Sequence, residues 1–89
     1  MLHEARGDYP AAITALERAL VDEPGLEPAY AHLMRLNARL GLRARALRWY
    51  TRLEETLRRE LDVAPDPGTR RLRDAIRIDT LSHHAAMPQ

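Results

Sequence analysis

The sequence of 89 residues has no cysteine, no phenylalanine and no lysine, and it contains no long apolar run. Without cysteine the chain can form neither a disulfide nor a thiolate metal site, which is typical of proteins from reducing compartments. No segment approaches the ~20 apolar residues that a membrane-spanning helix needs, and the first residues do not resemble a signal peptide. We therefore expect a cytoplasmic protein with no membrane partner.

Groups that carry out chemistry are also scarce. The sequence offers no glycine-rich phosphate loop and no convincing pair of carboxylates. Ser82 lies beside His83, but nothing in the sequence orients them as a catalytic dyad. His83 and His84 are a weak metal-binding pair. The sequence therefore predicts that the chain is not an enzyme, and no cofactor, metal or small-molecule ligand is expected.

The charges are unevenly distributed, although the formal net charge is only +1. Residues 1–27 hold six acidic residues against Arg6 and Arg18. Residues 35–52 hold no acidic residue, and their six arginines are Arg35, Arg39, Arg43, Arg45, Arg48 and Arg52. This asymmetry indicates a polar partner surface or a head-to-tail contact, not the block of like charge of a nucleic-acid-binding tail.

Residues 27–60 carry two helical patterns that meet at Gly41. Each pattern places core-compatible residues three or four positions apart, as in a helix with one buried stripe. The first stripe is Tyr30, Leu33, Met34, Asn37 and Leu40, and the second is Ala46, Leu47, Tyr50, Leu53 and Leu57. Gly41 supplies the left-handed residue that ends the first helix. The short connection predicts an antiparallel hairpin in which Leu33, Ala46, Tyr50 and Leu53 are buried together.

This hairpin is half of a repeat. The segment from Gly7 to Ile13 lies 34 residues ahead of the segment from Gly41 to Leu47, with glycine and alanine at matching places. Thirty-four residues is the period of tetratricopeptide repeats. We therefore predict an all-α protein in which tetratricopeptide-like helical hairpins stack as a short right-handed α-solenoid.

Local signals place four helices near residues 8–23, 27–40, 43–61 and 67–80. Asp8 and Asp66 are predicted N-caps, Pro67 occupies a first helical position, and Val63 is predicted to plug the connector as a buried residue. The expected stripe of the first helix is Tyr9, Ala12, Ile13, Leu16, Ala19 and Leu20, and that of the last helix is Leu72, Ala75, Ile76 and Leu81.

The run from Ala46 to Ile76 resembles the C-terminal half of the bacterial transcriptional activator domain. That domain is the tetratricopeptide-like module of the antibiotic-regulatory class of bacterial transcription activators. The most specific feature is a long helix ending at Glu60-Leu61, followed by Val63-x-Pro65-x-Pro67 and another amphipathic helix. The resemblance spans residues 1–78. The chain departs from it at Asp62, where glycine is usual, and at Ala64 and Gly68, where acids are common.

The resemblance implies a protein-interaction and regulatory module of a transcription regulator, which assists dimerisation or contacts the transcription machinery. It also implies that DNA binding resides in a missing upstream winged-helix domain, so no specific DNA binding is expected of this chain. We expect residues 1–81 to form an N-terminally truncated domain of this kind and residues 82–89 to form a flexible tail. The alternative is a freestanding tetratricopeptide adaptor that binds a peptide in its concave groove.

Three residues are candidates for partner binding. Arg35 and Arg39 lie four residues apart on a helix that would line the concave groove, where they could clamp carboxylates. The simpler interpretation, which we favour, is a pair of solvated arginines. Trp49 flanks the apolar stripe of the next helix, so it either half-buries against the following helix or anchors an interface.

Two further interpretations concern charge and self-association. Arg45, Arg48 and Arg52 share one face of a helix, and they could pair with Glu54, Glu55 or the acidic first helix, or contact nucleic acid. The N-terminal helix would have one side uncovered in a truncated domain, which predicts a homodimer through that helix. Contact between the acidic residues 1–27 and the arginines of a second copy would make the dimer salt-sensitive.

Overall fold

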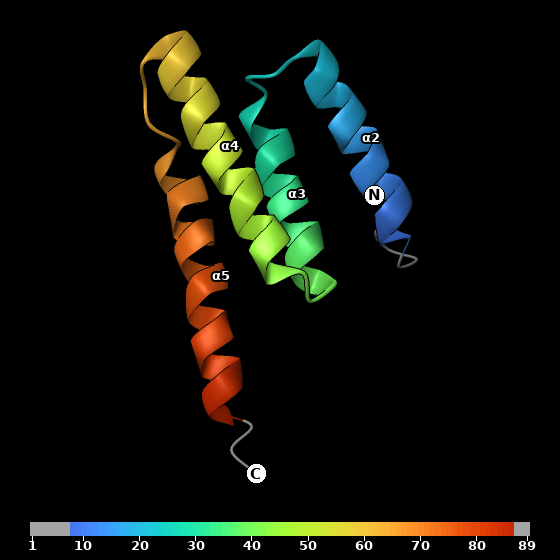
Figure 1. The fold of residues 1–89 in the computed structure, drawn as a ribbon, viewed down its shortest axis with the longest axis vertical. Coiled ribbons are helices and arrows are strands. Elements are labelled where there is room, and N and C mark those ends of the chain that lie inside the picture. Colours follow the sequence, from blue (N-terminus) through green and yellow to red (C-terminus); the bar gives the residue numbers. More distant parts are fainter. Residues whose placement is uncertain (1–7, 87–89) are drawn as a thin grey trace.

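The computed structural model describes residues 8–86, and side chains up to residue 78. Helices are the only regular secondary structure in the residues described, which confirms the predicted all-α class. The helices are α2 (Tyr9–Asp22), α3 (Glu27–Arg39), α4 (Arg43–Leu61) and α5 (Pro67–Ala86). Figure 1 shows that successive helices run in opposite directions along the long axis. α5 continues to Ala86, beyond the predicted end near residue 80.

The turn between α3 and α4 forms as predicted. Gly41 has a φ of 79°, in the left-handed region that glycine adopts without strain. The Leu42 N–H donates to the Asn37 carbonyl at 2.8 Å, and the Gly41 N–H donates to the Ala38 carbonyl at 3.0 Å, so the last carbonyls of α3 are satisfied. This tight turn brings α3 and α4 together as an antiparallel hairpin.

The core lies on both sides of α3. Leu33, Ala46, Tyr50 and Leu53 are all buried in one cluster, as predicted from the stripes. The fully buried Leu36 was not on the predicted stripe. It is buried because α3 packs against α2 as well as against α4 and α5, so more than one of its faces is covered. Leu40 was predicted to be buried but is 41% exposed, because α3 has already ended there.

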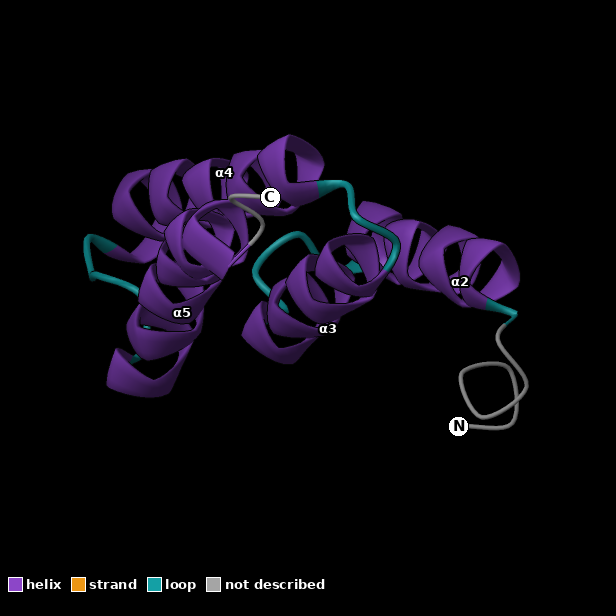
Figure 2. Cartoon of the chain, turned by 90° about the horizontal axis from the view of Figure 1, so that it is seen from below, coloured by secondary structure: helices purple, strands orange, loops and turns teal. Residues whose placement is uncertain are grey.

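Figure 2 shows the helices end-on, with α3 and α5 on the same side of α4. α2 packs against α3 through the buried Ala12 and Leu20, and Ile13 and Leu16 are half-buried against the same core. The turn from α2 to α3 is tied to the core because the Tyr30 hydroxyl donates to the Pro24 carbonyl at 2.7 Å.

The connector from α4 to α5 differs from its prediction in one residue. Val63 is 49% exposed, so its expected role as an apolar plug is wrong, and Pro65 is the buried residue instead. Asp62 adopts a left-handed conformation with a φ of 54°. That turn redirects the chain before Val63, which leaves the valine on the outer side.

Polar contacts fix where α5 begins. Asp66 Oδ2 accepts a hydrogen bond from the Gly68 N–H at 3.2 Å, as predicted for an N-cap residue. The Asp66 N–H itself donates to Glu27 Oε2 at 2.7 Å, which joins the first turns of α5 and α3.

Along α5, Ile76 is buried and Leu72 is half-buried, but Ala75 is exposed, contrary to the predicted stripe. The side chain of Leu81 lies outside the described residues.

Asp8 occupies the N-cap position of α2, as predicted, but its side chain makes no capping hydrogen bond.

Candidate protein-binding groove

A groove runs between α2 and α4, which both pack on α3. It consists of two adjoining cavities, of about 320 and 440 Å³, that share Glu17, Trp49 and Arg52 in their walls. We call it the α2–α4 groove. The described residues that line it are Glu17, Leu20, Val21, Pro24, Tyr30, Arg45, Arg48, Trp49, Arg52, Thr56 and Arg59.

The geometry of α4 explains why these residues share one face. Each residue of an α-helix advances by about 100°, so positions 45, 48, 49, 52, 56 and 59 form one narrow stripe. The core residues Ala46, Tyr50, Leu53 and Leu57 form a second stripe roughly a quarter to a third of a turn away. The groove stripe carries four exposed arginines, Arg45, Arg48, Arg52 and Arg59, which we call the arginine row. The row extends over about 21 Å of helix.

Trp49 forms part of the groove wall beneath the arginine row. Its ring packs edge-on against Tyr30, with centroids 6.0 Å apart and planes at 65°, and only 8% of the residue is exposed. The Arg52 guanidinium lies 4.5 Å from the centre of the indole ring. Such a contact holds a cation over the electron-rich face of the ring.

This placement corrects the prediction that Trp49 half-buries against the following helix. The face of α4 toward α5 is taken by Tyr50, over which the Arg73 guanidinium stacks at 4.7 Å. Trp49 is one residue earlier, hence about 100° around the helix, and so it packs toward α3 instead. Its role as an interface anchor stays a prediction.

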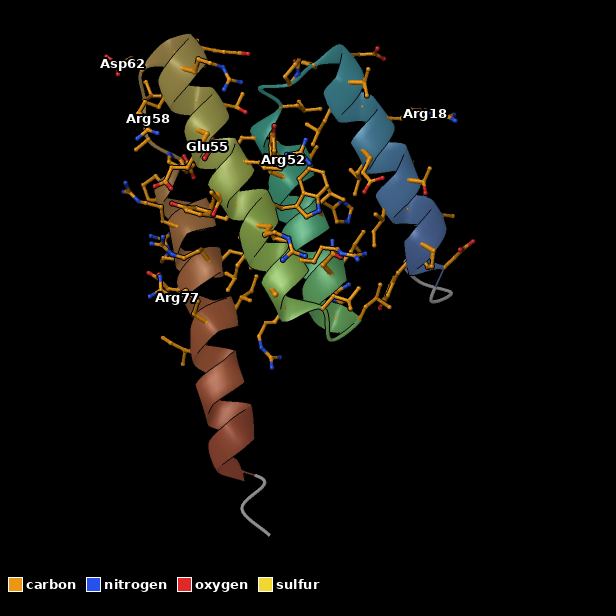
Figure 3. The ribbon with its side chains drawn as sticks, viewed as in Figure 1. Arg18, Arg52, Glu55, Arg58, Asp62 and Arg77 are labelled. Atoms are coloured by element: carbon orange, nitrogen blue, oxygen red, sulfur yellow. The ribbon has the colours of Figure 1, made fainter. Side chains whose placement is uncertain are left out.

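The electrostatics of the groove are unbalanced. Among the described residues of the lining, Glu17 on α2 is the only acidic one, opposite four arginines. Arg45, Arg48 and Arg52 form no ion pair within 4.0 Å with any residue that the structure describes. The pairing with Glu54, Glu55 or the acids of the first helix that the sequence left open is therefore not formed. Figure 3 shows Arg52 on the side of α4 toward α2, whereas Arg58 lies on the opposite side and Arg18 points away from the groove.

The other two candidate residues lie elsewhere. Arg35 and Arg39 are both exposed on α3, and neither lines the α2–α4 groove. Arg39 lies about 180° around α3 from Tyr30, which faces the groove. The structure thus does not bring these arginines together with Trp49. Sequence reasoning recognised part of the arginine row but missed Glu17 and Arg59. The periodic spacing from Arg45 to Arg59 was the signal that could have identified the latter.

Two other sites bear on function. A cavity of about 280 Å³ between α3 and α5 is lined by Ala38, Arg43, Ala75 and Ile76. At the α4–α5 contact, burial raises the pKa of the Tyr50 phenol, and the Arg73 guanidinium opposes part of that effect.

No helix in the described part of the chain is long and apolar enough to cross a membrane. Residues 8–86, as far as they are described, hold no cluster of three metal-ligating side chains.

Comparison with known proteins gives one match. The sequence model of the bacterial transcriptional activator domain matches residues 2–77. No curated protein and no solved structure shows a significant match to the chain.

Proposed function

The chain belongs to the bacterial transcriptional activator domain family, and from this membership we propose that it is a protein-contact module of a bacterial transcription regulator. The observation that best supports this role is the α2–α4 groove, with its buried tryptophan and its row of arginines, which form no ion pair with any described carboxylate. Aromatic and arginine side chains are enriched where proteins bind one another. The proposed module acts in the cytoplasm, without catalysis or a cofactor.

The proposed architecture is a tetratricopeptide-like stack of helical hairpins with a right-handed turn, formed by residues 1–81. Residues 82–89, of which 82–86 continue α5, are proposed to lie outside the stack. The 34-residue offset between Gly7 and Gly41 supports this arrangement, as does the alternating direction of neighbouring helices. Stacked hairpins present long grooves to partners, and such grooves suit a contact module.

The proposed partners are a second copy of the chain and the transcription machinery. Sequence-specific DNA recognition is assigned to a separate domain of the regulator. The 14 arginines of this chain are offset by 13 acidic residues, and the arginine row faces a groove walled by the acidic α2. A duplex bound there would meet unfavourable charge on one side.

A peptide-binding adaptor unrelated to transcription is the second candidate function. The cavity between α3 and α5 supports it, because these helices would line the concave side of a tetratricopeptide stack. Arg35 and Arg39 are proposed contacts for the carboxylates of such a peptide.

The test combines two measurements on the purified chain. Immobilised chain is presented with purified RNA polymerase holoenzyme and, separately, with soluble chain, and a gel-shift titration uses promoter DNA at physiological salt. The proposed function predicts protein binding in at least one of the first two assays and no sequence-selective DNA binding. Nanomolar, sequence-selective binding to DNA without protein binding would overturn it. Binding of a peptide by a chain that contacts neither RNA polymerase nor a second copy of itself would favour the adaptor.

A further inference from the structure

The arginine row concentrates positive charge on one exposed face of α4. Arg45, Arg48 and Arg52 lie three and four residues apart, so three like charges occupy successive turns of one helix face. Like charges at this spacing destabilise a helix, and no described carboxylate within 4.0 Å compensates for them. Glu17 on the opposite wall supplies one negative charge, which leaves the groove net positive.

The Trp49 ring organises the row for binding. The guanidinium of Arg52 lies over the indole ring, 4.5 Å from its centre, which restricts the position of the group. The N–H edges of a guanidinium match the two oxygens of a carboxylate. Because this arrangement exists before a ligand arrives, less conformational entropy is lost on binding.

The two walls of the groove indicate what kind of anion fits. A nucleic acid carries phosphates along its whole length and would bring some of them against Glu17 of α2. A protein helix carries its charge on one face only. Its carboxylates can face α4 while a neutral or basic residue faces Glu17, and an apolar side chain between the carboxylates can contact Trp49.

The acidic residues of α2 do not lie on one face of the helix, as a ligand of the arginine row must have its carboxylates. Glu17 and Asp22 are five residues apart and point about 140° away from each other around the helix. A second copy of α2 therefore cannot present both carboxylates to the arginine row at once.

Resting on the proposed role in protein contacts, we propose that the α2–α4 groove binds an acidic helix of a partner protein. The helix presents carboxylates at i, i+4 and i+7 to Arg45, Arg48 and Arg52, and it places an apolar side chain on Trp49.

Trp49 is the only tryptophan of the chain, so its fluorescence reports directly on the groove. The probe is a helical peptide of about 16 residues, with glutamates at i, i+4 and i+7, one leucine between them and no aromatic residue. The matched control peptide carries glutamine in place of each glutamate. We expect the glutamate peptide to shift the Trp49 emission saturably, and we expect its dissociation constant to rise with added salt. Equal binding of the glutamine peptide would overturn the proposal.

Substitutions then locate the site. Arg48→Gln and Arg52→Gln should each weaken the glutamate peptide about two- to fivefold, which is the usual range for exposed ion pairs, and the double variant about tenfold. Arg58→Gln removes the same charge from the opposite side of α4 and should change the dissociation constant less than about twofold. Affinities come from titration midpoints, because Arg52→Gln also alters the starting emission, and circular dichroism verifies that each variant is folded. A loss of affinity in Arg58→Gln equal to that in Arg48→Gln would overturn the assignment to this groove.

Two last measurements distinguish a protein ligand from nucleic acid, and failure of the acidic-helix proposal from failure of the proposed function. A duplex DNA of about 20 base pairs, titrated in the same buffer, should bind more weakly than the glutamate peptide; tighter binding would overturn the choice of a protein ligand. Self-association and polymerase binding are measured on the Arg48→Gln/Arg52→Gln variant. If the peptide fails to bind while these contacts persist, only the acidic-helix proposal is lost. If the chain contacts no protein at all, the proposed function is lost with it.

Discussion

Leu53 is fully buried between α3 and α4, where it belongs to the same cluster as Leu33 and Tyr50. Its replacement by alanine removes apolar contact and leaves a cavity that close-packed neighbours fill only in part. We expect Leu53→Ala to lower the free energy of unfolding by ~2–5 kcal/mol in urea titrations. Leu61→Ala is the matched control, because Leu61 lies on the same helix but is 64% exposed. A loss below about 1 kcal/mol for Leu53→Ala would contradict the core described above.

Asp62 ends α4 in the left-handed conformation, with a φ of 54°. A residue with a Cβ is strained there, whereas glycine is not, and aspartate tolerates the strain better than most residues. We expect Asp62→Gly to raise the free energy of unfolding by about 0.5–1 kcal/mol and Asp62→Val to lower it by about 1–2 kcal/mol. Thermal and urea unfolding check both. The opposite order of the two variants would show that the turn is held by other contacts.

Tyr50 lowers the free energy of unfolding when the pH becomes alkaline. Burial raises the pKa of its phenol above the ordinary value of 10.0, with Arg73 opposing this in part. The folded chain therefore holds the phenol proton more tightly than the unfolded chain. This contribution to stability is complete below pH 10 and is lost as the pH rises through the folded-state pKa. The free energy of unfolding should fall more steeply above pH 10 in the native chain than in Tyr50→Phe, and parallel pH profiles would contradict this.

At the scale of elements, the first turns of α3 and α5 are joined across 39 positions of sequence by one hydrogen bond, from the Asp66 N–H to Glu27 Oε2. It adds to the buried Pro65 and Ile76 in holding α5 against the hairpin. We expect Glu27→Ala to lower the free energy of unfolding by about 0.5–1.5 kcal/mol. Amide hydrogen exchange should become faster at Asp66 and in the first turn of α5, while α4 keeps its protection.

The control for this link is Glu60→Ala, which removes an exposed carboxylate near the end of α4. It should change neither the stability by more than about 0.5 kcal/mol nor the exchange at Asp66. Uniformly faster exchange in Glu27→Ala would mean that the bond stabilises the whole chain and not the position of α5.

At the scale of the whole molecule, α2 is the least covered helix of the described core. It packs on α3 alone, and Val21 is 78% exposed while Ala15 is exposed on its surface. Small side chains allow a second helix to approach closely, and exposed apolar groups favour association. We expect the chain to dimerise through α2, which sedimentation equilibrium at tens of micromolar protein would detect.

Ala15→Arg should block this close approach and give a monomer. Ala64→Arg adds the same side chain to the exposed connector after α4 and should leave the dimer intact. A strict monomer of the native chain at low salt would contradict the prediction, and a dimer in both variants would assign the contact to another surface.

Local signals in the sequence were enough to place the helices and the turns between them, except that α5 continues beyond residue 80 to Ala86. Helix limits, the left-handed Gly41 and the Asp66 cap follow from residues within a few positions of one another, so their signals can be read locally. The central cluster of Leu33, Ala46, Tyr50 and Leu53 could also be predicted, because a turn as short as that at Gly41 leaves two helices only one way to face each other.

Which of the remaining helix faces are covered depends on how the helices pack against one another. Leu36 is buried and Val63 is exposed because of where α2 and α5 come to lie, and neither position follows from local spacing. The same holds for the α2–α4 groove. Trp49 packs toward α3 because Tyr50 and Arg73 fill the side toward α5, and Glu17 becomes its opposite wall only when α2 folds onto α3. Burial and the pairing of charges depend on contacts between segments distant in sequence, and these are set when the helices pack.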